Sequence, residues 1–174
     1  MTIRAALALG ANLGDRCAAL QHAIGILEND STVTVIAVSD LYETDPIGGP
    51  QQPQYLNAVV VLESNEFGAD EPSFARFLLR RAHDIEQQLQ RTRGVRWGPR
   101  TMDVDVLAVG GWESADPQLI VPHPRIGERA FVLVPWEQVD AEFVVAGLDQ
   151  TVAELLAQLP AADRATVERM PQSN

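Results

Sequence analysis

The order of apolar and polar positions predicts alternating strands and helices over the first 110 residues. Stretches that are continuously apolar, or apolar at every second position, are typical of strands. They cover residues 3–9, 32–39, 55–63 and 103–109. Apolar side chains at helical spacing predict amphipathic helices over 16–28 and 72–90. This β-α-β-β-α-β order predicts an α+β, ferredoxin-like fold, with an antiparallel sheet, both helices on one face and the other face open to a ligand.

The boundaries of these elements carry local signals. Asp15 precedes the first helix and is a plausible N-cap, and Pro72 stands where a proline is tolerated at a helix start. Residues 43–54 contain three prolines and two glycines, which predicts a loop. Loops of this length inside a compact domain are often functional.

The second part of the chain predicts additions to this core. A short helix is expected over 130–138 and another one near Thr151. A chain of this length is expected to form one domain, over residues 1–160, followed by a polar C-terminal tail over 161–174.

Composition narrows the class of protein. The chain has 174 residues, of which 46% are hydrophobic, and no apolar stretch is long enough to span a membrane. A single cysteine, Cys17, excludes an intramolecular disulfide and a zinc–thiolate cluster, so a cytoplasmic location is expected. The net charge of −11 argues against general nucleic-acid binding, which needs a broad basic surface.

The strand near residue 104 carries two carboxylates on one face. Asp103 and Asp105 alternate with apolar Met102, Val104 and Val106, so the aspartates point away from the core. Two carboxylates about 7 Å apart along a strand can hold one or two hard cations, whose other ligands are water and phosphate oxygens. An exposed edge strand that is acidic by chance is the alternative interpretation of this pair alone.

An arginine-rich segment precedes these carboxylates. Residues 87–102 contain four arginines and no acidic residue, in a chain whose net charge is −11. Arginine binds phosphate oxygens through two parallel hydrogen bonds, so the segment favours a polyphosphate partner over a solvated acidic face.

A second distinctive stretch spans residues 121–131. Prolines on both sides of His123 favour an extended backbone, and Arg129 and Phe131 follow at a possible helix start. Taken alone, the stretch also fits a proline-rich crossover with a surface histidine.

Together these segments resemble the 6-hydroxymethyl-7,8-dihydropterin pyrophosphokinase family of folate biosynthesis. The resemblance covers about residues 3–137, and six motifs occur in the same order with similar spacing. They are 10–15 (GANLGD), 42–44 (YET), 52–57 (QPQYLN), Ile85-Glu86 with Arg91 and Arg93, 96–107 (RWGPRTMDVDVL) and 122–125 (PHPR). The fold of that family is the ferredoxin-like one expected above.

The resemblance implies an activity and its co-substrates. Members of the family transfer pyrophosphate from ATP to the hydroxymethyl group of the pterin and release AMP. By position, Asp103 and Asp105 would be both catalytic residues and ligands of two Mg²⁺ ions, and Arg91 and Arg100 would assist catalysis. An alcohol bound to Mg²⁺ loses its proton more readily, so no histidine base is required, and either aspartate could receive the proton.

The resemblance also implies two sets of binding residues. Those expected to bind ATP are Glu86, Arg93, Arg96, Trp97, Arg100, Val106, His123 and Arg129. Those expected to bind the pterin are Thr44, Asp45, Ile47, Tyr55, Asn57, Trp97 and Phe131. A flat pterin ring calls for aromatic stacking and an amide edge, which Tyr55, Phe131 and Asn57 would supply. Without the resemblance, both rings would be interpreted as core aromatics, Glu86 as a polar helix residue and Trp97 as loop packing.

Two other interpretations stay open at this point. The chain could be a binding module without chemistry, or another nucleotide-dependent transferase that acts on a different alcohol. An RNA-binding interpretation is disfavoured by the net charge. The expected partners are small molecules only, with a monomer in contact with neither nucleic acid nor membrane, and with loose contact to neighbouring folate-pathway enzymes as a possibility.

Overall fold

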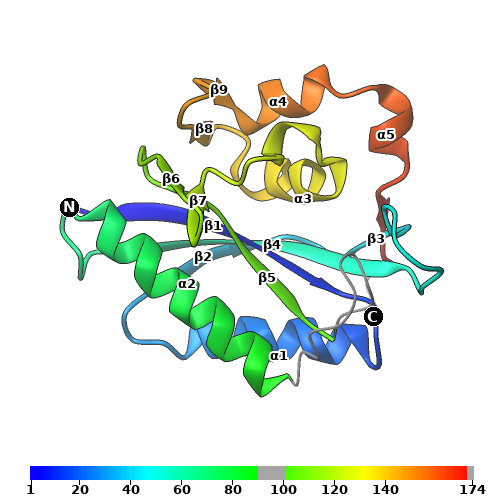
Figure 1. Cartoon of the computed structure of the whole chain (residues 1–174), viewed down its shortest axis with the longest axis horizontal. Helices are drawn as coiled ribbons and strands as arrows, with labels where there is room; N and C mark the ends of the chain where they lie inside the picture. The colour runs from blue at the N-terminus through cyan, green and yellow to red at the C-terminus, as the bar shows by residue number, and fades with distance from the viewer. Residues whose placement is uncertain (90–100, 172–174) are drawn as a thin grey trace.

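The computed structural model describes residues 1–89 and 101–171, and a central antiparallel sheet lies between two layers of helices (Figure 1). The mixed α/β class and the antiparallel sheet agree with the prediction. The strand order is β10-β3-β4-β1-β5, and β2 also pairs with β4. The sheet consists of β1 (Ile3–Ala11), β2 (Thr34–Val38), β3 (Tyr42–Thr44), β4 (Tyr55–Ser64), β5 (Asp103–Val109) and β10 (Glu168–Arg169).

Helices and two small hairpins make up the other regular elements in the described residues. The helices are α1 (Arg16–Glu28), α2 (Glu71–Gln88), a 3-10 turn η1 (Ile126–Glu128), α3 (Ala130–Asp140), α4 (Val152–Gln158) and α5 (Ala161–Ala165). The hairpins pair β6 (Ser114–Asp116) with β7 (Leu119–Val121), and β8 (Val144–Val145) with β9 (Gln150–Thr151). No helix in the described part of the chain is both long and apolar enough to cross a membrane.

The predicted helix and strand boundaries hold to within a few residues. The first helix has its predicted bounds, and Asp15 is its N-cap, because its Oδ1 accepts the Ala18 N–H at 2.9 Å. The second helix begins one residue earlier than expected, after the N-cap Asp70. Local capping and periodicity therefore sufficed for these two elements.

Two hydrophobic cores lie on opposite faces of the sheet. On one face α1 packs against β1 and β4 and α2 packs against β5, and the buried side chains of this core include Leu7, Leu20 and Phe74. On the other face α3 and α4 contribute Trp136 and other buried residues. The expectation that the second face is open to a ligand is therefore wrong for the part of the sheet that these helices cover. Apolar residues between 130 and 156 are buried against that part of the sheet.

The C-terminal segment is part of the fold. Residues 161–165 form α5, and Glu168 and Arg169 of β10 pair with Glu43 and Tyr42 of β3 (Figure 1). The described part of the segment expected as a polar tail, residues 161–171, is mostly exposed, but it extends the edge of the sheet. Strands of two or three residues are too short to show an alternating pattern, so neither β3 nor β10 was predicted.

A buried carboxylate joins α2 to the start of the strand β5. The Oε1 atom of Glu86 accepts the Val104 N–H at 3.0 Å, and Glu86 is only 6% exposed. A buried N–H without an acceptor is costly, so this contact helps to set where Asp103 and Asp105 lie.

Replacing Glu86 should therefore affect stability. We expect Glu86→Ala to lower the free energy of unfolding by about 1–3 kcal/mol, because the buried Val104 N–H loses an acceptor. Glu86→Gln, which keeps a carbonyl oxygen, should cost less. Urea unfolding measures both, with Gln87→Ala on the exposed face of α2 as the control. Equal unfolding curves for Glu86→Ala and the control would contradict this role.

Candidate functional site

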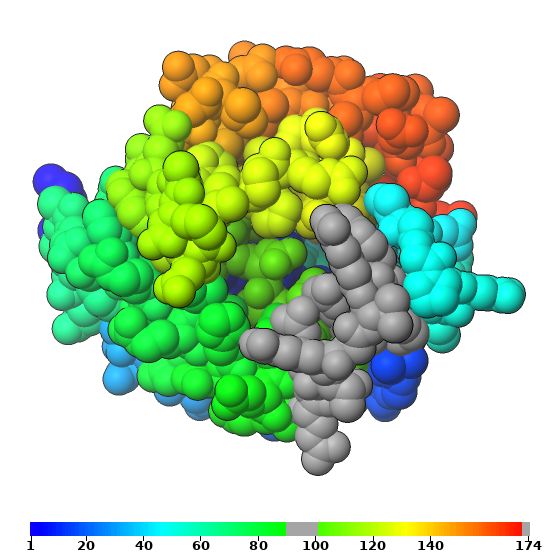
Figure 2. Space-filling view, viewed as in Figure 1, coloured from blue at the N-terminus to red at the C-terminus, as the bar shows by residue number. Residues whose placement is uncertain are grey.

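A cavity of about 390 Å³ opens on the face of the sheet that carries α3, beyond the part that α3 covers. Figure 2 shows the surface hollowed beside α3, which is coloured yellow there. Segments far apart in the sequence line the cavity: β1, the β3–β4 connection, β4, β5 and residues 123–132. Ten residues predicted to form a site line it: Thr44, Asp45, Ile47, Tyr55, Asn57, Asp103, Asp105, His123, Arg129 and Phe131.

The floor of the cavity is formed by small residues of β1. Ala8 pairs with Val59 of β4 and Asp105 of β5, and Gly10 pairs with Asn57 and Asp103. Residues paired across strands project from the same face. The functional side chains thus stand on the two strands that flank β1, and the absence of a large side chain at positions 8 and 10 leaves the space between them open.

Gly10 is confined by its neighbours. A Cβ atom built on Gly10 would lie 3.3 Å from Oδ1 of Asn57 and 3.8 Å from Cδ1 of Tyr55. The first distance is tighter than ordinary van der Waals contact, so any side chain here would push against the Asn57 amide.

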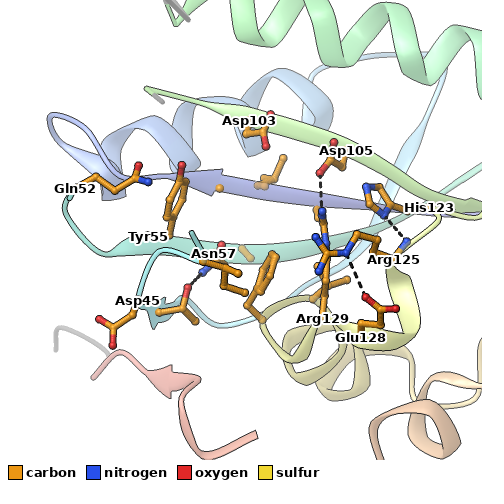
Figure 3. Close-up of a pocket in the computed structure, with 18 residues that line it drawn as sticks. Asp45, Gln52, Tyr55, Asn57, Asp103, Asp105, His123, Arg125, Glu128 and Arg129 are labelled. Carbon is orange, nitrogen blue, oxygen red and sulfur yellow. Dashed lines mark hydrogen bonds and ion pairs between the residues drawn. The ribbon is translucent and has the colours of Figure 1, made fainter. Parts of the chain in front are cut away.

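The two aspartates of β5 form the acidic side of the cavity. Asp103 and Asp105 lie on the same face of the strand, whereas Val104 and Val106 are buried, as the alternation predicted. Arg129, just before α3, reaches toward Asp105, with 3.9 Å between its Nη1 and Oδ2 of Asp105 (Figure 3). The Asp105 side chain is 38% exposed and accessible from the cavity.

The aspartate pair fits a cation whose remaining ligands come from a substrate. Among the described residues, no group of three or more histidine, cysteine or acidic side chains is arranged to hold a metal ion by itself. Mg²⁺ commonly uses only one or two protein carboxylates and completes its shell with water and phosphate oxygens. The donor set at Asp103 and Asp105 is compatible with that mode of binding.

A histidine and two arginines lie next to the aspartates. Partial burial and the nearby Arg129 guanidinium lower the pKa of His123 to about 4, and Asp103 opposes this effect weakly. The Arg125 N–H donates to Nδ1 of His123 at 3.2 Å, so the neutral ring carries its proton on Nε2. Burial also lowers the pKa of Arg129, while Asp105 acts in the opposite direction. At neutral pH His123 is a neutral hydrogen-bond donor beside a cation.

An amide and two aromatic rings line the other end of the cavity. Asn57 Nδ2 donates to Oγ1 of Thr44 at 2.8 Å and more weakly to the Tyr42 carbonyl at 3.4 Å, which orients the amide. Tyr55 stands two residues earlier on β4, and Phe131 projects from the first turn of α3. The Arg129 Cζ atom lies 5.5 Å from the centre of the Phe131 ring, which is cation–π distance. This end offers flat apolar surfaces next to a fixed amide.

The loop that borders this end is tied to the β1–α1 turn. Asn12 Nδ2 donates to Oε1 of Gln52 at 2.9 Å and to the Pro53 carbonyl at 3.0 Å. Arg16 donates to the Gln54 carbonyl at 2.9 Å and pairs with Glu43 at 2.7 Å. Asn12 and Gln52 belong to the motifs 10–15 and 52–57, so these contacts connect two segments that were predicted separately.

Some predicted site residues lie elsewhere. Glu86 lies outside the cavity and binds the β5 backbone. Val106 is 7% exposed in the core beneath the sheet, so any contact it makes with a nucleotide would have to come from its backbone. Five residues lie outside the described part of the chain: Arg91, Arg93, Arg96, Trp97 and Arg100.

The sequence alone did not single out some lining residues as site residues. Arg125 and Glu128 line the cavity and pair with each other at 3.2 Å. Their positions close to His123 and Arg129 in the sequence were the available signal. Gly10 opens the motif at residues 10–15 but was assigned no role there. Ala8 gave no signal, because a small apolar residue in a strand is normally interpreted as core.

Comparison with known proteins identifies related sequences. The model of the family described as 7,8-dihydro-6-hydroxymethylpterin-pyrophosphokinase matches residues 6–141. The chain is 42% identical over 163 residues to a 2-amino-4-hydroxy-6-hydroxymethyldihydropteridine pyrophosphokinase of Bacillus subtilis, covering 90% of this chain and 92% of the relative. It is also 42% identical over 176 residues to the enzyme of that name from Mycobacterium tuberculosis, covering 94% and 88%.

Solved structures share the fold at low sequence identity. Plasmodium falciparum HPPK-DHPS, in a wild-type crystal structure with pterin and p-hydroxybenzoate, aligns with a TM-score of 0.65 at 14% identity. The alignment covers 97% of this chain and 46% of that one, so this chain spans about half the length of the Plasmodium protein. This likeness concerns the fold.

The low pKa of His123 can be tested directly. NMR titration of the ring should place its pKa at about 4. At pH 6 only ~1% of the ring would be protonated, against ~75% for an ordinary histidine. Arg129→Gln should raise this pKa, because a neighbouring positive charge that opposes protonation is removed. Arg4→Gln is the control, since Arg4 pairs with Glu63 and Asp140 instead. An unchanged pKa in Arg129→Gln would contradict the assignment of the electrostatic cause.

Proposed function

Since the chain belongs to the 7,8-dihydro-6-hydroxymethylpterin-pyrophosphokinase family, we propose that the cavity beside α3 is its active site. The protein is a pyrophosphokinase that transfers a pyrophosphoryl group to hydroxymethyldihydropterin in folate biosynthesis. The observation that supports the proposed site most strongly is the meeting of a carboxylate pair, a cationic wall and an aromatic–amide slot in one cavity.

The two ends of the cavity suit the two reactants. The end formed by Asp103, Asp105 and Arg129 carries two negative charges and one positive charge. With Mg²⁺ held by the two carboxylates it would favour a triphosphate, and we assign ATP as the phosphoryl donor. The end formed by Tyr55 and Asn57 is flat and offers an amide, which favours the pterin ring. The hydroxymethyl group would then point across the floor at Gly10 toward the phosphates.

The reaction moves one pyrophosphoryl unit between two oxygens. In the proposed step the pterin hydroxyl oxygen forms a bond to the β-phosphorus of ATP, the bond to the α-phosphate oxygen breaks, and AMP leaves. The hydroxyl proton passes to a carboxylate, Asp103 or Asp105. With two Mg²⁺ ions held by these carboxylates, as we propose, phosphate charge would be neutralised and the alcohol would become more acidic.

Arg129 and His123, which both line the cavity, would orient ATP. Arg129 lies 3.9 Å from Asp105 and can exchange this contact for phosphate oxygens. His123 donates from Nε2 without adding a charge, because its pKa is about 4. We assign catalytic assistance to Arg91 and Arg100, and nucleotide contacts to Arg93, Arg96, Arg100 and Trp97, from the family resemblance alone. All five lie outside the described residues.

The amide end would select the pterin. Tyr55 and Phe131 are assigned to stacking against the ring and Asn57 to its hydrogen-bonding edge. Thr44 holds the Asn57 amide, so its side-chain role in this proposal is indirect. Asp45 and Ile47 belong to the exposed loop at the entrance, where we assign them contacts to the ring edge.

We further assign the core to the ferredoxin-like class. This assignment is supported by the chain order β1-α1-β2/β3-β4-α2-β5, with β4 and β5 on either side of β1 and with α1 and α2 on one face. Residues 130–171 would then be additions that cover part of the other face and extend one edge.

Loss of one carboxylate should stop the transfer. We expect Asp105→Asn to lower kcat on the order of 10²-fold, because charge stabilisation of the transferred group is weakened. The assay measures AMP formed from ATP with and without hydroxymethyldihydropterin, over a range of Mg²⁺ concentrations. Asp116→Asn on β6 is the matched control, since it keeps the side-chain acceptor for the Gln118 N–H. AMP formation that does not require pterin, or that is undiminished in Asp105→Asn, would overturn the proposed mechanism.

A methyl group on the cavity floor should affect ligand binding at the two ends of the cavity differently. Gly10→Ala places a Cβ atom 3.3 Å from Oδ1 of Asn57, so the amide must shift. We expect pterin binding to weaken by roughly tenfold, which corresponds to about 1.4 kcal/mol of repacking cost. Binding of a non-hydrolysable ATP analogue should change much less. Isothermal titration with each ligand measures this, and equal losses for both would argue against a pterin site at Asn57.

A further inference from the structure

The last described strand lies against the strand that supports the Asn57 amide. In β10, Arg169 pairs with Tyr42 of β3, and the Met170 N–H donates to the Leu41 carbonyl at 2.8 Å. The C-terminal segment therefore runs along the outer edge of β3, more than 120 residues away in sequence (Figure 1).

A cluster of polar side chains holds this edge to α3. Oε1 of Gln138, on α3, accepts the Asp40 N–H at 2.9 Å and the Tyr42 hydroxyl at 3.0 Å. Nε2 of Gln138 donates to the Asp40 carboxylate, and the Arg169 guanidinium forms an ion pair with the same carboxylate. Arg169, Asp40 and Gln138 thus join β10 and α3 to the residues just before β3.

The same short strand determines how Asn57 is oriented. Tyr42 supplies its carbonyl and Thr44 its hydroxyl to Nδ2 of Asn57. Only three residues of β3 pair with β4, so β4 by itself fixes the strand through few contacts. On the opposite face Arg16 holds Glu43 at 2.7 Å, and β3 is therefore held from both sides.

From these contacts we propose that Arg169 is a positioning residue for the pterin end of the active site. It acts through Asp40 and β3 on the Asn57 amide and touches neither reactant. This inference rests on the proposed assignment of Asn57 to pterin binding. It concerns a residue in a segment that the sequence predicted only as a polar tail.

The position of Arg169 makes a selective effect expected. Its side chain is 59% exposed, so truncation leaves no cavity in either core and should alter global stability little. The phosphate end of the cavity depends on β5 and Arg129, which Arg169 does not touch in any described contact. Loosening β3 should therefore weaken pterin binding and leave nucleotide binding unchanged.

Binding measurements on full-length variants test this inference. We expect Arg169→Ala to weaken pterin binding about threefold to fivefold, the effect of losing one partly exposed ion pair. The dissociation constant of a non-hydrolysable ATP analogue and the melting temperature should stay close to wild type. In steady state, KM for the pterin should rise more than kcat falls. Arg169→Lys, which keeps a positive charge near Asp40, should restore part of the affinity.

Two further variants make the outcome decisive. Arg164→Ala removes an exposed arginine of α5 from the same segment and should leave pterin binding unchanged. Asn57→Ala tests the subsite on which the inference rests. If Asn57→Ala weakens pterin binding and Arg169→Ala does not, or if Arg169→Ala weakens both ligands equally, the positioning role is wrong. If Asn57→Ala leaves pterin binding unchanged, the pterin subsite itself is wrong.

Discussion

The position of β1 between β4 and β5 is the constraint on which the rest of the site depends. Backbone hydrogen bonds on both sides of β1 set one register, and in that register Gly10 lies between Asn57 and Asp103. A shift of one residue would turn every side chain of a strand to the other face. The apolar residues of β1, such as Leu7 and Leu9, prevent such a shift, because they are buried against α1 and α2. Core packing on one face of the sheet therefore sets the positions of the site residues on the other face.

The partial cover provided by α3 gives the cavity its electrostatic character. Trp136 and its neighbours cover one part of the sheet face that carries α3. The start of the helix brings Arg129 and Phe131 to the uncovered part of that face. Burial near this boundary lowers the pKa values of both His123 and Arg129. Groups that lose water in this way interact more strongly with a charged reactant than they would on an open surface. The same helix thus closes a core and lines a site.

Much of this arrangement could be predicted from local sequence. The alternation of Asp103 and Asp105 with buried valines was sufficient to place both carboxylates on one face, because the period of a strand is two residues. The family resemblance assembled ten lining residues that no single spacing rule connects. Local pattern was misleading for the second face of the sheet. For Glu86 the resemblance implied a nucleotide contact, and local pattern alone implied a polar residue on a helix surface. Glu86 lies buried against the β5 backbone.

What the sequence determined by itself is the set of elements with strong periodicity and capping, together with the residue types that chemistry on a phosphate and a flat ring would need. Tertiary structure decided which of these residues meet, how far α3 covers the sheet and where the C-terminal segment lies. The pairing of β10 with β3 and the contact from Thr44 to Asn57 join segments that carry no signal for each other in the sequence. Such short elements gain their stability from neighbours brought together by the folded core, so no local pattern could predict them.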